Sequence, residues 1–320
     1  MKTKLKGKNF ITLRDWSKEE IDTLLDVSFD LKRKFAIGEF TPYLQYKTIF
    51  LMFFEQSTRT RNSMEAGVFQ LGGHANFLDT STMQVSHGEV AKDTGTILSS
   101  FGHGLACRYC DWGKGNKYIN EMAKYSSTPV MNLQCDLYHP MQGITDLMTI
   151  KELKKETKHL KVSIIWAYAE SHKKPISVPL TQALLFTRYS MDVTLAYPKG
   201  FEMPDWVIEE ARKNAKDSNG SFKISHNIEE AFTDADVVIP KNWGSWSSKE
   251  ENVDITKFKD WKCTEKMMSL ADEDVIYMHA LPADRGNEVE DSVIDGKASV
   301  VYTEAENRLH TAKAVMALTL

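Results

Sequence analysis

The chain has 320 residues, of which 42% are apolar and 26% are charged, and its formal net charge at pH 7 is −4. These proportions are those of an ordinary globular protein and exclude a disordered or fibrous chain, and the slightly acidic balance argues against a nucleic-acid partner. No run reaches the roughly 18 apolar residues of a membrane span and the start of the chain has no signal-peptide core, so a cytoplasmic protein without membrane attachment is expected.

The first predicted element is an amphipathic helix that follows Ser17. Ser17 and Glu20 have the spacing of a capping box, and Gly38 supplies a signal for the end of the helix. The apolar residues between them recur at helical spacing and form one stripe: Ile21, Leu24, Leu25 and Leu31.

An alternation of strands and helices follows. The apolar run Thr48 to Glu55 has the length of a strand covered on both faces. The further strands are predicted at 74–79, 105–110 and 130–133, with helices from near Thr60, Glu89 and Lys117, and then at 162–168, 193–197, 222–225, 237–240 and 275–279, with Asn227 and Glu230 capping one helix. This rhythm predicts an α/β protein with two doubly wound domains, each built on a central parallel sheet.

The domain boundary is predicted near residue 150, in a helical stretch from about Gln142 to Glu156. A chain of 320 residues exceeds what one core usually supports, so we expect a first domain of residues 1–150 and a second of residues 151–303. The last segment, 304–320, is predicted to be a helix that packs back on the first domain.

The first motif with chemical meaning joins the strand at 48–55 to a helix. It reads Gln-Ser-Thr-Arg-Thr-Arg over residues 56–61. Free N–H groups at a helix start favour phosphate, and the motif adds hydroxyl donors and a fixed cation: Ser57, Thr58, Thr60 and Arg59. The alternative is an ordinary helix cap with two solvated arginines.

A second motif follows the strand at 130–133. His139 and Gln142 stand three residues apart, so that both side chains can address one small planar group such as a carbonyl with its amide nitrogen. The carboxyl ends of strands hold ligands in open α/β sheets. The alternative is that His139 is a cap or a core partner.

Two further segments complete the pattern. Pro282 ends the strand at 275–279 and leaves backbone carbonyls without ladder partners, and such carbonyls accept from an NH2 group. Glu304-Ala-Glu-Asn-Arg308 opens the final helix, from which Arg308 can reach the first domain. The alternative for this last segment is a surface helix with paired charges.

In their order and spacing these four segments resemble the signatures of the aspartate and ornithine carbamoyltransferases, and the resemblance covers nearly the whole chain. It implies transfer of a carbamoyl group from carbamoyl phosphate to the amine of an amino acid or derivative, without a covalent enzyme intermediate, a cofactor or a metal. It also implies a homotrimer, because a loop matching Thr80 to Glu89 completes the neighbouring subunit's site in this family. That loop offers Gln84 and His87.

The resemblance also assigns roles. Ser57, Thr58, Arg59 and Thr60 would hold the phosphate, Arg108 would bridge phosphate and carbonyl, His139 would polarise the carbonyl oxygen, and Gln142, Arg308 and the backbone carbonyls of Ala280 and Leu281 would surround the carbamoyl nitrogen. Arg108, His139 and Thr60 would be the catalytic donors that stabilise the developing oxyanion.

The acceptor side departs from the ornithine enzymes. Their Asp-x-x-x-Ser-Met-Gly and Gly-Asn-Asn segments are missing, and the corresponding stretches look most like the knotted branch, which includes the acetylornithine and succinylornithine carbamoyltransferases and an uncharacterised YgeW-type group. This implies a knotted loop near residues 174–179 and an acceptor other than ornithine. The expected acceptor-binding residues are Lys241, which would anchor a carboxylate, with Trp243, Asp136 and Asp284; the alternative is a strand-end lysine and a core tryptophan.

Competing interpretations remain. Ala280 stands where ornithine-type enzymes usually place Cys, which leaves room for a non-catalytic protein that binds carbamoyl phosphate, and an ornithine enzyme with a divergent acceptor site is the other alternative. A nicotinamide enzyme is disfavoured because no Gly-x-Gly-x-x-Gly follows a strand and opens a helix. Cys107 and Cys110 lie at a predicted buried strand without a second pair, so no metal site is expected.

Overall fold

The computed structural model describes residues 4–170, 174–246 and 254–320. Contacts divide the chain into two compact units. One comprises the chain up to Met148 together with Glu306–Leu320, and the other comprises Thr149–Ala305. The divisions fall inside two helices, α5 (Pro140–Lys154) and α11 (Val301–Thr319). Among the described residues, no helix combines the length and hydropathy needed to cross a membrane.

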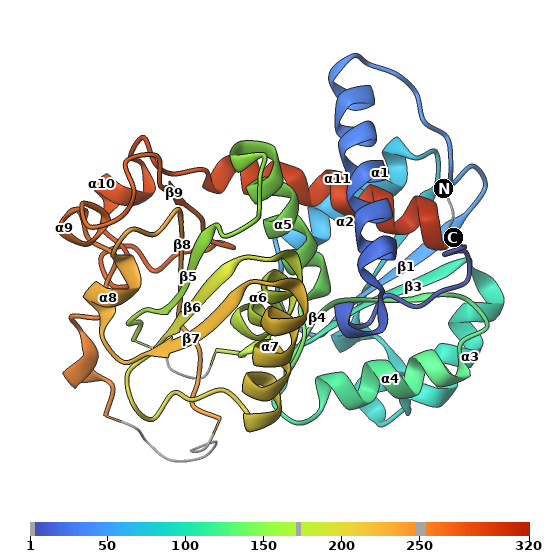
Figure 1. The fold of residues 1–320 in the computed structure, drawn as a ribbon. Coiled ribbons are helices and arrows are strands. Elements are labelled where there is room, and N and C mark those ends of the chain that lie inside the picture. The colour runs from blue at the N-terminus through green and yellow to red at the C-terminus, as the bar shows by residue number, and fades with distance from the viewer. Residues whose placement is uncertain (1–3, 171–173, 247–253) are drawn as a thin grey trace. The chain divides into compact units, whose positions relative to one another are not determined.

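The first unit is built on a parallel sheet in the order β2-β1-β3-β4, whose strands are β1 (Thr48–Phe53), β2 (His74–Asp79), β3 (Gly104–Tyr109) and β4 (Val130–Cys135). β1 and β4 are almost wholly buried, and the continuous apolar run of β1 is typical of a strand covered on both faces. The helices α3 (Ala91–Phe101) and α4 (Gly115–Tyr125) pack together on one side of the sheet, and α1 (Lys18–Ala36) and α11 lie on the other (Figure 1). The helix α2 (Arg59–Gln70) connects β1 to β2.

The helix α1 forms where the local sequence signals predicted it. The Ser17 side chain accepts from the backbone of Glu20, and the Glu20 carboxylate accepts from the backbone N–H of Ser17, which is a complete capping box. The expected stripe of apolar residues is buried. Gly38 follows the helix with a φ of 71°, a left-handed conformation that suits glycine.

The second unit has a parallel sheet in the order β7-β6-β5-β8-β9, with strands β5 (Lys161–Trp166), β6 (Asp192–Ala196), β7 (Ser221–Ser225), β8 (Val237–Lys241) and β9 (Ile276–Tyr277). Its helices are α6 (Ser177–Phe186), α7 (Asp205–Ser218), α8 (Ile228–Phe232), α9 (Glu265–Met268) and α10 (Asp291–Ile294). α6 and α7 lie side by side against the sheet (Figure 1). Short 3-10 turns complete the chain: η1 (Leu13–Asp15), η2 (Thr80–Thr82), η3 (Gln84–His87), η4 (Thr187–Tyr189) and η5 (Thr256–Phe258).

The predicted fold class is therefore confirmed, with local differences. The α8 cap is only half of a capping box: Asn227 accepts from the backbone of Glu229 and Glu230, but the Glu230 carboxylate accepts from the Ser225 hydroxyl. β9 is shorter than predicted because the His279 N–H donates to the Glu304 carboxylate instead of to the ladder. The knotted loop stays a prediction, and residues 171–173, next to it, lie outside the described residues.

The strand orders fix where a ligand site can form. In the first sheet β1 lies between β2 and β3, and in the second β5 lies between β6 and β8. The chain therefore changes direction at the β1/β3 and β5/β8 pairs, which are the topological switch points, and ligands in open α/β sheets bind beside the carboxyl ends of such strands. The predicted phosphate motif follows β1, and Lys241 ends β8.

Candidate active site

The segment after β1 has the features of an anion site. Thr58 is the N-cap residue of α2, but its side chain makes no capping hydrogen bond within the described chain. The first-turn N–H groups of a helix have no intrahelical acceptor, so they and the positive helix end remain for an anion. Ser57 and Arg59 are half-buried and Thr60 is buried beside them.

Arg308 reaches this segment from the last helix. Its Nη1 donates to Thr60 Oγ1 at 3.2 Å, and the Arg308 side chain is buried. Both residues belong to the first unit. The contact joins two sequence motifs that lie 248 positions apart in the chain.

Arg108 comes from the end of β3, next to β1. The register between β3 and β4 shifts between Cys107 and Arg108, and an irregularity of this kind re-aims a side chain. Arg108 Nε lies 3.9 Å from the Glu55 carboxylate, whose other oxygen accepts from the backbone N–H of Cys110 at 2.7 Å. Sequence reasoning missed Glu55, because only the β1/β3 pairing brings it to Arg108.

The cations in this unit favour a bound anion. Burial and then the nearby charge of Arg108 lower the pKa of Arg59, which shows that the two guanidinium groups are close enough to repel. Burial raises the pKa of Glu55, so this carboxylate is a poorer counterion than an exposed one. An anion between the arginines would relieve the repulsion.

His139 and Gln142 are held by a tight turn after β4. Cys135 N–H donates to the Tyr138 carbonyl at 2.9 Å, which places buried His139 at the start of α5. His139 Nδ1 accepts from the Gln142 backbone N–H at 3.4 Å, a contact that assigns the ring proton to Nε2. Burial, then the charges of Arg308 and Arg108, hold the pKa of His139 well below its usual range.

The Gln142 side chain is also oriented. Its Nε2 donates to Asp146 Oδ1 at 2.5 Å, so the oxygen of the same amide is the atom that can accept from a ligand's NH2 group. The first unit thus brings together six of the predicted donor-site residues with defined contacts or charge coupling: Arg59, Thr60, Arg108, His139, Gln142 and Arg308.

Other residues of the same segments lie elsewhere. Arg61 stacks on the Phe77 ring, with Cζ 3.4 Å from the centroid, and pairs with Glu65 at 2.9 Å. Gln84 and His87 are exposed on η3. Asp136, predicted at the acceptor site, has a different role, because its two oxygens accept from the backbone N–H groups of Gly113 and Asn116 at the start of α4.

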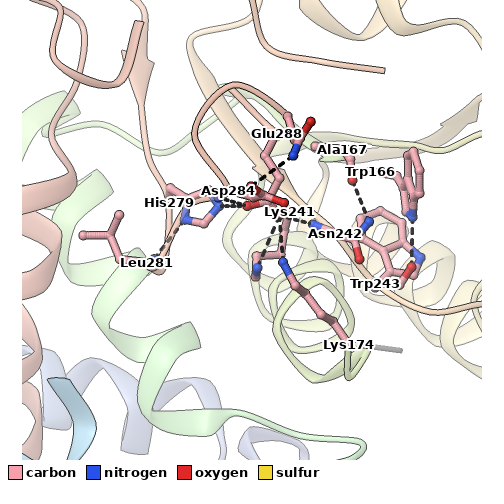
Figure 2. Close-up of polar contacts among 11 residues, drawn as sticks. Trp166, Ala167, Lys174, Lys241, Asn242, Trp243, His279, Leu281, Asp284 and Glu288 are labelled. Atoms are coloured by element: carbon pink, nitrogen blue, oxygen red, sulfur yellow. Dashed lines mark hydrogen bonds and ion pairs between the residues drawn. The ribbon is translucent and has the colours of Figure 1, made fainter. Parts of the chain in front are cut away.

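In the second unit a buried carboxylate organises the end of β8. Glu288 Oε1 lies 3.5 Å from Lys241 Nζ and 3.8 Å from Lys174 Nζ, and Oε2 lies 3.3 Å from His279 Nε2 (Figure 2). The backbone N–H groups of Asn242 and Asp284 donate to it at 2.8 and 2.7 Å. Burial alone would raise the pKa of Glu288, but the contact with His279 and the charge of Lys241 outweigh it and lower the pKa.

The same cluster shapes the turn after β9. His279 Nδ1 accepts from the Leu281 N–H at 2.9 Å, and Leu281 has a φ of 48°, unusual for a residue with a side chain. Within the described chain, no backbone N–H donates to the carbonyls of Ala280 or Leu281. These are the carbonyls that the resemblance assigned to the carbamoyl nitrogen.

Trp243 is not available as an acceptor-binding residue, and one carboxylate oxygen of Asp284 already accepts a hydrogen bond within the protein. Trp243 is a core tryptophan: its side chain is fully buried and its indole N–H donates to the Phe201 carbonyl at 3.0 Å. The alternative interpretation therefore applies to Trp243, because no indole edge remains for a ligand. Asp284 is half-buried, and its Oδ1 accepts from Asn287 Nδ2 at 3.2 Å.

The described residues contain no group of three or more His, Cys, Asp or Glu side chains placed to hold a metal ion. The cysteines are free, and burial raises the pKa of Cys107, so this thiol stays protonated.

Known families and structures match this chain over both units. The carbamoyl-phosphate-binding domain of the aspartate/ornithine carbamoyltransferases matches residues 8–152, and their Asp/Orn-binding domain matches residues 176–319. An ornithine carbamoyltransferase from Caldicellulosiruptor saccharolyticus is 40% identical, with 97% of each chain covered.

Two solved structures are similar throughout. The ornithine carbamoyltransferase from Pyrococcus furiosus has a TM-score of 0.90 and 36% identity, with 99% of this chain and 98% of that chain covered. An acetylornithine transcarbamylase solved with acetylcitrulline has a TM-score of 0.90 and 29% identity, with 97% of this chain and 98% of that chain covered.

Proposed function

The chain belongs to the aspartate/ornithine carbamoyltransferase family and is a carbamoyltransferase, and we propose that its acceptor is an amino acid or amino-acid derivative other than ornithine. The observation that carries the proposal is Lys241, whose ammonium group lies at the carboxyl end of β8, at the switch point of the second sheet. A lysine there suits a carboxylate and repels a second ammonium group.

The donor site follows from the first unit. Ser57, Thr58 and the first-turn N–H groups of α2 bind the phosphate together with Arg59, and Arg108 spans phosphate and carbonyl. Two half-buried, mutually repelling guanidinium groups, those of Arg59 and Arg108, support this role, because a phosphate dianion offsets both charges.

The reaction is a direct attack of the acceptor amine on the carbamoyl carbon. The new C–N bond forms, the C–O bond to phosphate breaks, and the departing phosphate takes up the proton that the amine loses. Negative charge develops on the carbonyl oxygen, where His139 Nε2–H, Arg108 and Thr60 stabilise it. His139 acts as a neutral donor, in accord with its lowered pKa.

The carbamoyl nitrogen needs acceptors. The Gln142 amide oxygen serves this purpose, and Arg308 holds Thr60 in position. The resemblance to the family supports the same role for the backbone carbonyls of Ala280 and Leu281. Because the Ala280 contribution is a backbone carbonyl, the absence of the usual Cys side chain leaves it intact.

Ornithine itself is the second candidate acceptor. It is favoured by the relatives, which are named ornithine carbamoyltransferases at 36–40% identity. Against it stands the absence of the Asp-x-x-x-Ser-Met-Gly segment, because the corresponding stretch, residues 239–246, carries Lys241. The acetylornithine transcarbamylase among the similar structures was solved with an N-acylated product, which makes an acylated amino acid a reasonable first choice for testing.

The proposal extends to assembly and location. We infer a cytoplasmic homotrimer in which Gln84 and His87 of one subunit complete the donor site of the next. Their exposure on η3 supports this, because exposed polar side chains are accessible to a neighbouring chain. The loop at 174–179 is proposed to be knotted.

The decisive experiment is titration calorimetry with carbamoyl phosphate, followed by a panel of amines scored for ureido product. We expect donor binding and product with one amine that is not ornithine. Product with ornithine at the highest kcat/KM would overturn the acceptor proposal. Lys241→Met should raise the acceptor KM at least about tenfold and leave donor binding unchanged; an unchanged acceptor KM would remove Lys241 from the site.

A further inference from the structure

The surface over Glu288 is cationic. The Glu288 side chain is 0% exposed, whereas the side chains of Lys241 and Lys174 are 14% and 34% exposed. Both ammonium groups lie within 4 Å of the same carboxylate oxygen, Oε1 (Figure 2). A molecule that approaches this cluster therefore meets the two lysines before it meets the acid beneath them.

A ligand's ammonium group cannot use Glu288 as its partner. One carboxylate oxygen accepts a hydrogen bond from the Asn242 N–H. The other accepts from the Asp284 N–H and faces His279. These protein groups surround the buried carboxylate on the sides that the lysines leave. His279 is uncharged near pH 7, because burial lowers its pKa.

Lys174 is held at this place by the backbone. Its carbonyl oxygen accepts from the Gly244 N–H at 2.9 Å, which ties the segment after β5 to the segment after β8. β5 and β8 are the strands of the switch point, so Lys174 and Lys241 converge from the two sides of it. The position is thus a property of the fold.

We propose that Lys174 is a second anchor of the acceptor, and that the Lys174/Lys241 pair selects acceptors that carry a carboxylate without a free ammonium group beside it. This inference rests on the proposed function. It narrows the acceptor to ω-amino acids, such as 5-aminopentanoate, or to diamino acids with an acylated α-amine. A free α-ammonium next to two lysines is a like-charge contact, which disfavours binding strongly at close range.

The first test uses ligands that have no amine at the reacting end. Pentanoate, norvaline and N-acetylnorvaline share one carbon chain and one carboxylate, and only norvaline has the free α-ammonium. With carbamoyl phosphate at saturation, calorimetry should show that pentanoate and N-acetylnorvaline bind at least about tenfold more tightly than norvaline. Equal or tighter binding of norvaline would contradict the inference.

The second test changes the lysine. Lys174→Met should weaken pentanoate binding about tenfold and reduce the preference over norvaline, while Lys174→Arg keeps both. Lys213→Met is the matched control, because Lys213 is 75% exposed on α7 and pairs with Asp217. If Lys174→Met binds pentanoate as tightly as the unchanged protein, Lys174 is not an anchor.

These tests separate the two proposals. The two calorimetric tests measure binding alone, whereas the amine panel measures the reaction. If no amine gave ureido product, the proposed function would be removed, and the calorimetry would still decide the charge preference. Conversely, product from ornithine and 5-aminopentanoate with equal kcat/KM would keep the enzyme and overturn the selection.

Discussion

Arg308 Nη1 donates to Thr60 Oγ1 at 3.2 Å, and the two residues are separated by 248 positions in the chain. The bond connects the last helix to the start of α2 inside one unit. It gives the guanidinium group of Arg308 a fixed place beside the phosphate motif.

Removing the Thr60 hydroxyl should impair the reaction with carbamoyl phosphate. Thr60→Val keeps the shape of the side chain but takes away both the hydroxyl that Arg308 binds and a donor to the carbonyl oxygen, so we expect kcat/KM for carbamoyl phosphate to fall about 100-fold. The control is Thr96→Val on the exposed face of α3, which should leave the kinetics unchanged. A Thr60→Val enzyme with normal kcat/KM would separate the bond from catalysis.

The two arginines of the phosphate motif should behave differently. Arg59→Ala removes a half-buried cation and should weaken carbamoyl phosphate binding at least about 100-fold by calorimetry. Arg61→Ala should leave that affinity nearly unchanged, because Arg61 lies on the Phe77 ring; it should instead lower the free energy of unfolding by about 1 kcal/mol. Equal losses of affinity in the two variants would contradict the site geometry.

His139 should remain uncharged over the working pH range. Burial and two neighbouring arginines lower its pKa, so it gains a proton only well below the ordinary value for histidine. The NMR signal assigned with His139→Gln should not titrate between about pH 5.5 and 8, and the same variant should lose about 100-fold in kcat. A titration midpoint near 6.5 would mean that the ring is not enclosed by these charges.

Glu288 should make the free energy of unfolding depend on pH in the acid range. Its pKa in the folded protein is lowered from the ordinary 4.5. Its contribution is therefore present above about pH 4.5 and is lost as the pH falls below this value, where the unfolded chain binds the proton first. Glu288→Gln should lower the free energy of unfolding at pH 7 by about 2–4 kcal/mol and flatten the acid dependence.

The measurement is denaturant unfolding at a series of pH values. Glu209→Gln, at an exposed position on α7, serves as the control and should follow the unchanged protein. An unaltered acid slope in Glu288→Gln would show that another carboxylate dominates the acid response.

The sequence by itself determined the elements that depend on local signals, and it predicted the residues of the donor site. The capping box at Ser17 and Glu20 and the buried run at Thr48 to Glu55 act over a few neighbouring residues, so they are readable without a structure. The same holds for His139 and Gln142, whose spacing on one helical turn fixes their proximity. The topological switch points are harder to predict from the sequence, because their positions depend on which strands pair.

Only the tertiary structure decided the partners of the charges. Lys241 and Glu288 are 47 positions apart, and Glu55 meets Arg108 only because β1 pairs with β3. Arg61 and Arg59 are alike in sequence, yet Arg61 lies on an aromatic ring while Arg59 is half-buried near Arg108. The physical reason is range: propensity and capping are local, whereas the partner of a buried charge is set by strand order and by loops that meet from distant parts of the chain.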